Sequence, residues 1–236
     1  MRLPPPLKTA FKSLKTQIRG VRGACAGCGG RSIICDEEAW SRLSEPDGPI
    51  VARAPQSGRG WSSTPEIRLR LIGAAHALQP ELTIETGAFE GLGTAALIEA
   101  APRSGRVVAF DHDDPEIAPL REATIQSAKR ARPDIVVKII LGDTRATLRE
   151  NAANLAGWGL WFQDSDHTPA GIAAEWSALE NLAAPDALCI FDDVDHRHPW
   201  AKRFAAEIAP GRWCWRTWFS GARRQFWAQR VCGAAR

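Results

Sequence analysis

From Thr64 onward, short apolar runs alternate with segments of helical length, and this alternation restricts the chain to one fold class. Such alternation is typical of a parallel sheet with helices on both faces, so we predict a doubly wound α/β domain. The runs that suit strands are 82–86, 106–111, 135–140, 160–164 and 187–193, and the segments that suit helices are 92–101, 116–131, 144–155, 169–183 and 198–208.

The last part of the domain departs from this pattern. The runs "RWCWRTWF" and "RRQFWAQR" read as two strands with no helix between them, so they should form an antiparallel pair at one edge of the sheet. In the first of them, Trp213 and Trp215 fall on one face, where the core of the domain would be. The tryptophans of the tail are therefore expected inside the protein.

Composition excludes several classes of protein. The chain has 236 residues, of which 44% are hydrophobic and 24% charged, as in ordinary globular proteins. No apolar run approaches the roughly 20 residues that a membrane-spanning helix needs. The first residues lack the apolar stretch of a secretory signal, and six cysteines do not make a disulfide framework. We therefore expect a cytoplasmic protein without a membrane span.

Residues 1–60 are predicted to form an N-terminal extension, and residues 61–236 the main domain. Residues 7–22 suit an amphipathic helix with a basic flank, which either docks on the domain or a second copy, or binds nucleic acid or a membrane surface. Residues 44–63, rich in proline, glycine and serine, suit a linker.

Three cysteines follow the basic helix. Cys25, Cys28 and Cys35 suit either a zinc site, for which a fourth ligand is not evident, or a glycine-rich turn with free thiols.

The turn after the first strand has the composition of a ligand-binding turn. Gly87 and Gly91 follow the run "LTIET", and glycines let the backbone approach a ligand closely. In doubly wound sheets, ligands bind at the carboxyl ends of the strands. The second strand ends in Asp111, where a carboxylate can bind ribose hydroxyls, and the third is followed by Gly142 and Asp143, which suit an adenine edge.

The glycine spacing distinguishes between two nucleoside cofactors. A nicotinamide site uses G-x-G-x-x-G to place a pyrophosphate at a helix N-terminus, whereas this chain has G-x-x-x-G-x-G preceded by Glu85. A carboxylate repels a pyrophosphate but suits an ammonium group. S-adenosyl-L-methionine (SAM) has an amino-acid end, a ribose and an adenine without phosphate, so it is the predicted cofactor.

The segments "ETGAFEGLGTAAL", "VVAFDHD", "ILGDT", "FQDSDHTPAGIAAE" and "CIFDDV" resemble class I SAM-dependent methyltransferases, above all the catechol and caffeoyl-CoA O-methyltransferases and related small-molecule enzymes. The resemblance covers about residues 62–230. It implies a Rossmann-like sheet of seven strands with an antiparallel C-terminal edge hairpin. At Gly93 this chain has glycine where the catechol type commonly has serine.

Carried over to this sequence, the resemblance implies a set of cofactor-binding residues. Glu85 and Gly87 would bind the methionine end, Asp111 the ribose, and Gly142, Asp143 and Thr144 the adenine region. The full implied set is Glu85, Thr86, Gly87, Phe89, Gly91, Thr94, Asp111, His112, Gly142, Asp143, Thr144 and Asp164.

Carboxylates end the fourth and fifth strands. Asp164 and the pair Asp192–Asp193 are one strand–helix–strand unit apart, so the two strand ends are expected side by side. Crowded carboxylates need a cation, and oxygen ligands favour Mg²⁺ or another divalent cation, so these three residues are the predicted metal ligands. They resemble the ligands of the metal-dependent enzymes. Adjacent strand residues face opposite ways, so Asp192 and Asp193 share an ion only if the strand has begun to turn.

The predicted activity is O-methylation of a small-molecule hydroxyl with the help of the metal. His167, His196 and Asp164 are the candidate catalytic residues, the two histidines as general bases. A nucleic-acid-binding methyltransferase and a non-catalytic scaffold are the alternatives. Nucleic acid is disfavoured because no N/D-P-P-Y segment occurs, and a homo-oligomer stays open.

Overall fold

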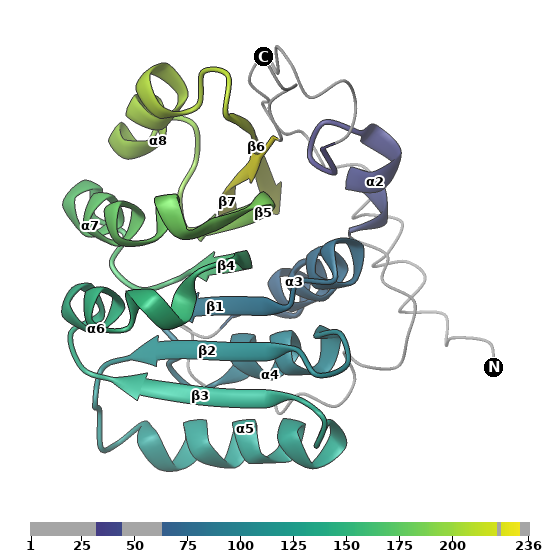
Figure 1. Cartoon of the computed structure of the whole chain (residues 1–236), viewed down its shortest axis with the longest axis vertical. Helices are drawn as coiled ribbons and strands as arrows, with labels where there is room; N and C mark the ends of the chain where they lie inside the picture. Colours follow the sequence, from purple (N-terminus) through teal and green to yellow (C-terminus); the bar gives the residue numbers. More distant parts are fainter. Residues whose placement is uncertain (1–31, 44–62, 221–222, 232–236) are drawn as a thin grey trace.

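The computed structural model describes residues 32–43, 63–220 and 223–231, and it has a seven-stranded sheet at its centre (Figure 1). The strand order is β3-β2-β1-β4-β5-β7-β6. The first five strands run parallel, and β7 is antiparallel to both β5 and β6. The predicted doubly wound sheet and its antiparallel edge hairpin are thus confirmed.

The strands follow the predicted apolar runs closely. They are β1 (Leu82–Thr86), β2 (Arg106–Asp111), β3 (Val136–Leu141), β4 (Trp158–Gln163), β5 (Ala183–Asp192), β6 (Trp213–Ser220) and β7 (Arg223–Arg230). The chain order reverses between β1 and β4, which are neighbours in the sheet. This is the switch point where open α/β sheets bind ligands.

The helices are α2 (Glu37–Arg42), α3 (Pro65–Leu78), α4 (Leu92–Ala100), α5 (Ala118–Ala131), α6 (Thr144–Glu150), α7 (Pro169–Leu179) and α8 (Pro199–Arg203). Two of them begin at a threonine cap followed by proline: Thr64 and Thr168 accept hydrogen bonds from Ile67 N and Gly171 N. A short π-helical turn, Phe204–Ile208, extends α8.

Several element boundaries differ from the prediction, most clearly the ends of α6 and α7 and the start of β5. Helix α6 ends at Glu150 and a separate 3₁₀ turn, Ala152–Leu155, completes the expected segment. Helix α7 ends at Leu179 and not at residue 183 as predicted. Strand β5 begins already at Ala183, which pairs with Trp158 of β4. The register shifts between Trp158 and Leu160, which lets the irregular start of β5 join the sheet.

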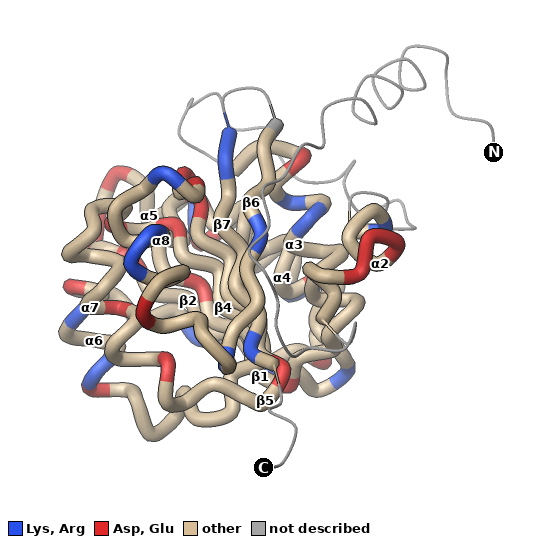
Figure 2. The backbone as a smooth tube through the Cα atoms, turned by 90° about the horizontal axis from the view of Figure 1, so that it is seen from above, with Lys and Arg blue, Asp and Glu red and all other residues tan. Residues whose placement is uncertain are grey.

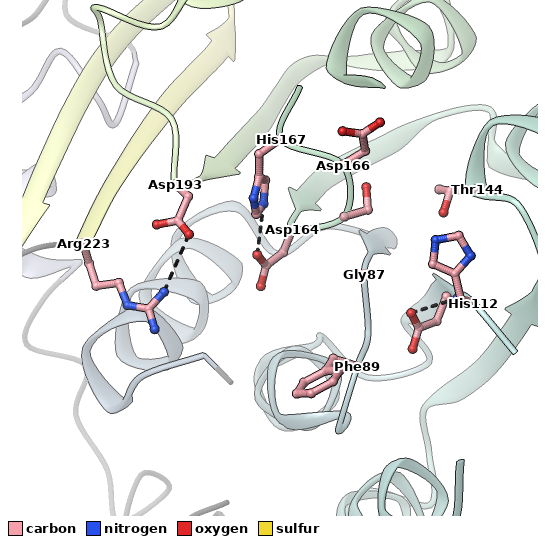
Figure 3. Close-up of a pocket in the computed structure, with 11 residues that line it drawn as sticks. Gly87, Phe89, His112, Thr144, Asp164, Asp166, His167, Asp193 and Arg223 are labelled. Carbon is pink, nitrogen blue, oxygen red and sulfur yellow. Dashed lines mark hydrogen bonds and ion pairs between the residues drawn. The ribbon is translucent and has the colours of Figure 1, made fainter. Parts of the chain in front are cut away.

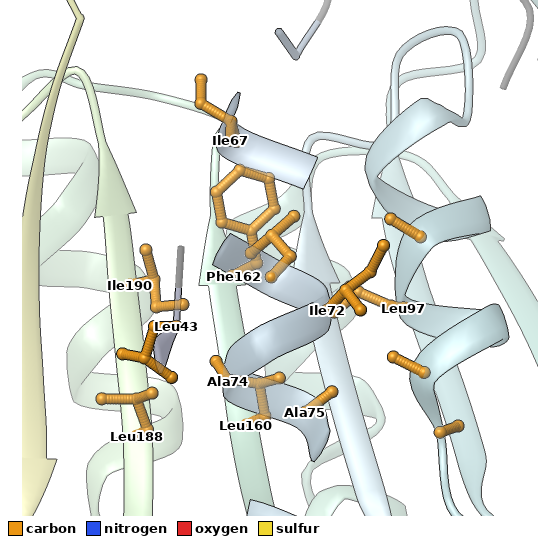
Figure 4. Close-up of a cluster of buried hydrophobic side chains, with 14 of the residues drawn as sticks. Leu43, Ile67, Ile72, Ala74, Ala75, Leu97, Leu160, Phe162, Leu188 and Ile190 are labelled. Atoms are coloured by element: carbon orange, nitrogen blue, oxygen red, sulfur yellow. The ribbon is translucent and has the colours of Figure 1, made fainter. Parts of the chain in front are cut away.

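Two apolar layers hold the helices to the sheet. One lies under α2, α3, α4 and α5, where Ile67, Ile72 and Leu97 pack against Leu160 and Phe162 of β4 (Figure 4). The other lies under α6, α7 and α8 and contains a group of aromatic rings around Trp176. Trp213 and Trp215 both face this second layer, as the sequence predicts. The sheet is therefore covered on both faces except along the edge strand β3, where Val136 and Leu141 are exposed.

Residues 32–43 pack against the edge of the sheet. Trp40 is 1% exposed and meets the ring of Trp227 edge-on at 5.1 Å between centroids. The Arg70 guanidinium lies 4.8 Å from the centre of the Trp40 ring, and Ser32 donates to Gln229 over 2.7 Å. This part of the predicted extension thus shares the core of the domain.

The remaining predictions for the N-terminus lie outside the described residues. They are the basic helix at 7–22, Cys25 and Cys28, and the linker as far as residue 62. Cys35 is described and half-buried. Along the described part of the chain, charged residues lie mainly on helices and turns while the strands are largely uncharged (Figure 2). No helix there has both the length and the apolar character to cross a membrane.

Candidate active site

A cavity of about 620 Å³ opens at the carboxyl ends of the parallel strands (Figure 3). It spans the switch point, since its walls come from the turns after β1, β2, β3, β4 and β5 and from the start of β7. The lining residues are Gly87, Phe89, Asp111, His112, Thr144, Asp164, Ser165, Asp166, His167, Asp193 and Arg223. Its volume is in the usual range for small-molecule sites.

The turn after β1 needs glycine because it passes against the end of β4. Gly87 has φ +91°, and a Cβ atom there would lie 2.1 Å from the carbonyl oxygen of Asp164. Gly91, with φ +80°, caps α4 in the left-handed conformation. The backbone of β1 can therefore reach the cavity wall only with glycine at position 87.

Glu85 lies behind this turn, in a small cavity that shares Gly87, Phe89 and Asp164 with the large one. It is 1% exposed, and Thr94 Oγ1 donates to its carboxylate. Burial above all, together with the nearby carboxylates of Asp164 and Asp111, raises the pKa of Glu85 to about 8, although the hydrogen bond from Thr94 opposes this shift. A buried carboxyl group of this kind is suited to a cationic ligand group, which would favour its ionised form.

The glycine at position 93, where the catechol-type enzymes commonly have serine, has a steric reason. A Cβ atom on Gly93 would lie 2.2 Å from Glu85 Oε1. The serine of the catechol type has no room beside Glu85 in this arrangement.

Asp111 lines the cavity from the end of β2 and is held by a buried arginine. Its Oδ2 lies 2.5 Å from Nη1 of Arg121, and its Oδ1 accepts from His112 N over 2.9 Å. Arg121 comes from α5 and is 4% exposed. A carboxylate has room for further hydrogen bonds beyond these two, so Asp111 can still accept from ribose hydroxyls.

Of the three residues predicted to bind the adenine, one lines the cavity and two do not. Thr144 lines the cavity, whereas Gly142 and Asp143 are not among its lining residues. Asp143 caps α6 by accepting from the backbone N–H groups of Arg145 and Ala146, and it pairs with the Arg145 side chain over 2.8 Å. Hydrogen bonds from Arg145 lower the pKa of this exposed carboxyl group to about 2.

The two acidic strand ends lie side by side, because Gln163 and Phe191, which directly precede Asp164 and Asp192, are partners in the β4–β5 register. Asp192 is 2% exposed and accepts from Gln225 Nε2 over 2.7 Å. Asp193 has φ +52°, so the strand has begun to turn, and its carboxylate lines the cavity 3.8 Å from Nη1 of Arg223. The neighbouring acids thus face different partners.

This geometry does not suit the predicted divalent cation. Asp192 accepts from Gln225 and is not among the lining residues, and the carboxylate that lines the cavity, Asp193, faces a guanidinium. Among residues 32–43, 63–220 and 223–231, no three His, Cys, Asp or Glu side chains are grouped so as to hold a metal ion. The donor set therefore does not fit the ion.

Of the two candidate histidines, His167 lines the cavity and His196 does not. His167 Nε2 lies 3.4 Å from Asp164 Oδ1, and this carboxylate raises the pKa of the imidazole. Burial raises the pKa of Asp164, and His167 opposes that effect. His196 instead lies edge-on to Phe219, 6.2 Å between ring centres.

Two residues that the sequence reading did not select hold the loop that carries His167. His198 Nε2 lies 3.0 Å from the carbonyl oxygen of His167, and Nδ1 of the same ring accepts from Trp200 N. The buried carboxylate of Glu175 accepts from Thr86 Oγ1 over 3.0 Å and from Ser165 Oγ over 2.6 Å. Thr86, which was predicted to bind the cofactor, is therefore linked through Glu175 to Ser165 in the loop that carries His167.

Arg121 and Arg223 were also missed. Neither is part of a recognisable motif, and each reaches the site from another element of the fold. The only sequence feature that pointed toward these arginines was the cluster of acids, which needs a positive charge nearby. From the sequence we assigned that charge to a metal ion.

The family model of a methyltransferase domain matches residues 84–194. This segment runs from within β1 to just past the end of β5 and contains most of the cavity wall. No curated protein sequence matches the chain at a significant level.

Several solved structures share the fold. The O-methyltransferase TomG from Streptomyces achromogenes, which is involved in tomaymycin synthesis and was crystallised with SAM, is 20% identical with a TM-score of 0.57, over 84% of this chain and 99% of that one. An O-methyltransferase from Bacillus cereus in complex with S-adenosylhomocysteine (SAH) is 17% identical with a TM-score of 0.58, over 85% and 97% of the two chains.

The SAH-bound methyltransferase PaMTH1 from Podospora anserina is 17% identical with a TM-score of 0.58, over 96% of this chain and 97% of that one. At these identities the likeness establishes the fold.

Proposed function

We propose that this chain transfers the methyl group of SAM to a hydroxyl oxygen of a small molecule. Its residues 84–194 match the model of a methyltransferase domain. The observation that carries the proposal is the single cavity in which Asp111 and His112 lie at one end and Asp164, His167 and Asp193 at the other (Figure 3). A nucleoside and a reacting centre can thus occupy one continuous space.

The chemistry of the walls supports SAM as the bound nucleoside. Glu85 offers the methionine ammonium group a buried carboxylate, Asp111 offers the ribose two oxygens, and the backbone of Gly87 permits close approach between them. SAM is bound in the TomG structure and SAH in the structure from Bacillus cereus. No phosphate has to be placed beside Glu85 in this arrangement.

A small molecule is proposed as the acceptor because the cavity is limited in size. About 620 Å³ accommodates a cofactor of this size together with one ring or short chain. The acceptor would lie at the end formed by His167, Asp193 and Arg223.

The side chains at that end can carry out the transfer. We assign the ring proton of His167 to Nε2, which lies 3.4 Å from Asp164 Oδ1, so that Nδ1 can accept the hydroxyl proton of the acceptor. The oxygen then forms its bond to the methyl carbon, the bond from sulfur to that carbon breaks, and its electron pair remains on sulfur as neutral SAH. This transfer does not use the predicted Mg²⁺, because Asp192 accepts from Gln225 and Asp193 faces Arg223.

Isothermal titration calorimetry with SAH tests the proposal. We expect SAH to bind while NAD and NADP do not, and Asp111→Asn should weaken SAH binding by about 1.5–3 kcal/mol, the worth of a charged hydrogen-bonding partner. Asp113→Asn, an exposed acid two residues further on, is the matched control and should leave affinity unchanged. Binding of NAD without binding of SAH would falsify the proposal.

A further inference from the structure

Two segments of the cavity wall are in direct contact. One is the turn that begins at the last residue of β1, residues 86–91 (the cofactor turn), and the other is the loop that follows β4, residues 164–168 (the acceptor loop). The backbone N–H of Asp164 donates to the carbonyl oxygen of Thr86 over 2.8 Å, and the Gly87 backbone lies against the same aspartate. Both segments contribute residues to the cavity (Figure 3). A shift of one segment therefore has to move the other or break this contact.

A buried carboxylate on a third element bridges these two segments. Glu175 belongs to α7, is 1% exposed, and is not among the residues that line the cavity. One of its oxygens, Oε2, accepts from Thr86 Oγ1 over 3.0 Å, and the other, Oε1, accepts from Ser165 Oγ over 2.6 Å. A buried carboxylate is tolerated only where such partners offset the loss of water. Glu175 therefore ties the cofactor turn to the acceptor loop.

Helix α7 holds the acceptor loop at further points. Thr168, at the end of the loop, caps the helix by accepting from Gly171 N over 3.0 Å. Gly171 and Glu175 are four residues apart and lie on the same face of the helix. At Gly171 the helix backbone lies against the loop, because a Cβ atom there would be 2.1 Å from Cγ of Asp166. The face of α7 that carries Glu175 is therefore the one packed on the acceptor loop.

The direction of the hydrogen bonds requires an acceptor at Glu175. Trp161 Nε1, which can only donate, donates to Thr86 Oγ1 over 3.3 Å. The amide nitrogen of Gln163 donates to Ser165 Oγ over 3.2 Å and to a backbone carbonyl oxygen over 3.1 Å, which fixes the orientation of that amide. Each hydroxyl thus accepts from a side chain of β4 and donates its single proton to Glu175. A carboxylate accepts both protons, whereas glutamine would present an N–H donor to one of the two hydroxyls.

We propose that Glu175 is a positioning residue that couples the two ends of the site, so that a cofactor bound at the cofactor turn orders the acceptor loop and its His167. This role presupposes the methyl transfer from SAM proposed above. In such a transfer the acceptor oxygen has to be aligned with the methyl group, and a displacement of about 1 Å can lower the rate about 100-fold. Glu175 acts through Thr86 and Ser165, because it does not itself line the cavity.

Such coupling has a measurable consequence in the absence of an acceptor. A ligand that holds the cofactor turn lowers the population of forms in which the acceptor loop has opened, to the extent that the two segments are linked. Local opening exposes backbone N–H groups to exchange with solvent. The effect of a cofactor on exchange in the acceptor loop therefore reports the link through Glu175.

Hydrogen–deuterium exchange followed by mass spectrometry tests this role. The full-length protein is labelled with and without saturating SAH, and exchange is compared in two peptides, one that contains residues 111–114 at the nucleoside end and one that contains residues 164–168. In the wild type we expect SAH to slow exchange in both peptides. In Glu175→Gln the slowing in the acceptor loop should be roughly 10- to 100-fold smaller, the worth of one hydrogen bond to a charged group, while the slowing at residues 111–114 is kept.

A second variant and a control separate coupling from stability. Ser165→Ala removes only the link to the acceptor loop, leaves Glu175 bonded to Thr86, and should also reduce the slowing in that loop. Glu180→Gln is the matched control, because Glu180 ends α7 and accepts from Trp176 Nε1 of the same helix. It should respond to SAH as the wild type does. Calorimetry with SAH establishes the concentration that saturates each protein.

The coupling is overturned if SAH slows exchange at residues 111–114 of the wild type but not at 164–168, or if either variant keeps the full slowing in the acceptor loop. Exchange in Glu175→Gln that is faster by the same factor with and without SAH has the same meaning, since Glu175 then serves the fold alone. If Glu175→Gln does not fold, Ser165→Ala decides. Absence of any SAH effect on both peptides of the wild type would instead contradict the proposed function.

Discussion

The α-carbon of Gly93 faces the carboxylate of Glu85 so closely that a Cβ atom would lie 2.2 Å from Oε1. The two residues belong to α4 and β1, and Thr94 donates to the same carboxylate. A single missing side chain thus leaves space for the group that we assign to the methionine end of the cofactor.

Replacing Gly93 with alanine should weaken cofactor binding more than it weakens the fold. The atom that has to move is the end of a flexible side chain, so Glu85 would rotate away from Thr94 at a cost of about 1–3 kcal/mol. We expect SAH affinity to fall about tenfold, with a small decrease in the melting temperature. In a Glu85→Ala background, the same substitution should no longer change SAH affinity; an unchanged effect would show that the two residues act independently.

Cofactor binding should release a proton, because Glu85 has a pKa of about 8 in the unliganded protein and an ammonium group requires its carboxylate form. Affinity for SAH should rise about tenfold per pH unit below 8 and level off above it. The stability of the unliganded protein should have the opposite pH dependence. Its free energy of unfolding should fall as pH rises from the usual value of 4.5 to about 8, since the folded state holds the proton that the unfolded state loses.

Calorimetry in buffers of different ionisation enthalpy measures the proton released on binding. Glu85→Gln should abolish both the release and the pH dependence. A proton count near zero in the wild type at pH 7 contradicts this assignment.

Arg121 should support the nucleoside end of the site through Asp111. Breaking a buried ion pair leaves one charge unpaired and costs about 3–5 kcal/mol, so Arg121→Leu should lower both the melting temperature and SAH affinity. Arg130→Leu, at a less buried position on the same helix, is the control. If Arg121→Leu lowers stability but leaves SAH affinity intact, the arginine serves the fold alone.

Divalent cations should not affect the site. We expect SAH to raise the melting temperature by the same amount in EDTA and in Mg²⁺, because the three strand-end acids already have partners. A larger rise in Mg²⁺ that disappears in Asp164→Asn and Asp193→Asn would restore the metal to the reaction.

Trp40 should be essential for the stability of the described core, although it lies in the predicted N-terminal extension. It is 1% exposed against Trp227, and Arg70 and Arg216 stack on its ring. We expect Trp40→Ala to lower the free energy of unfolding by about 3–5 kcal/mol in urea denaturation. A loss below 1 kcal/mol would mean that residues 32–43 are an appendage.

The sequence by itself determined the strands, the helix starts and several of the residues that meet at the carboxyl edge of the sheet. Apolar runs and capping residues are local signals, and parallel strands bring their carboxyl ends to one edge, so Gly87, Asp111 and Asp164 could be placed together in advance. Helix ends were less certain, as α6 and α7 show, because the last turn depends on what packs against it.

Only the tertiary structure decided the electrostatics of the site. Asp192 and Asp193 are adjacent in sequence, yet one accepts from Gln225 and the other faces Arg223, because the turn at φ +52° rotates the second away from the first. Arg121 reaches Asp111 from α5, the helix after β2, and Arg223 reaches Asp193 from β7, and neither arginine belongs to a motif that marks it as part of the site. The sequence could show that the clustered carboxylates need a cation, but which cation depends on side chains that only folding brings within a few ångströms.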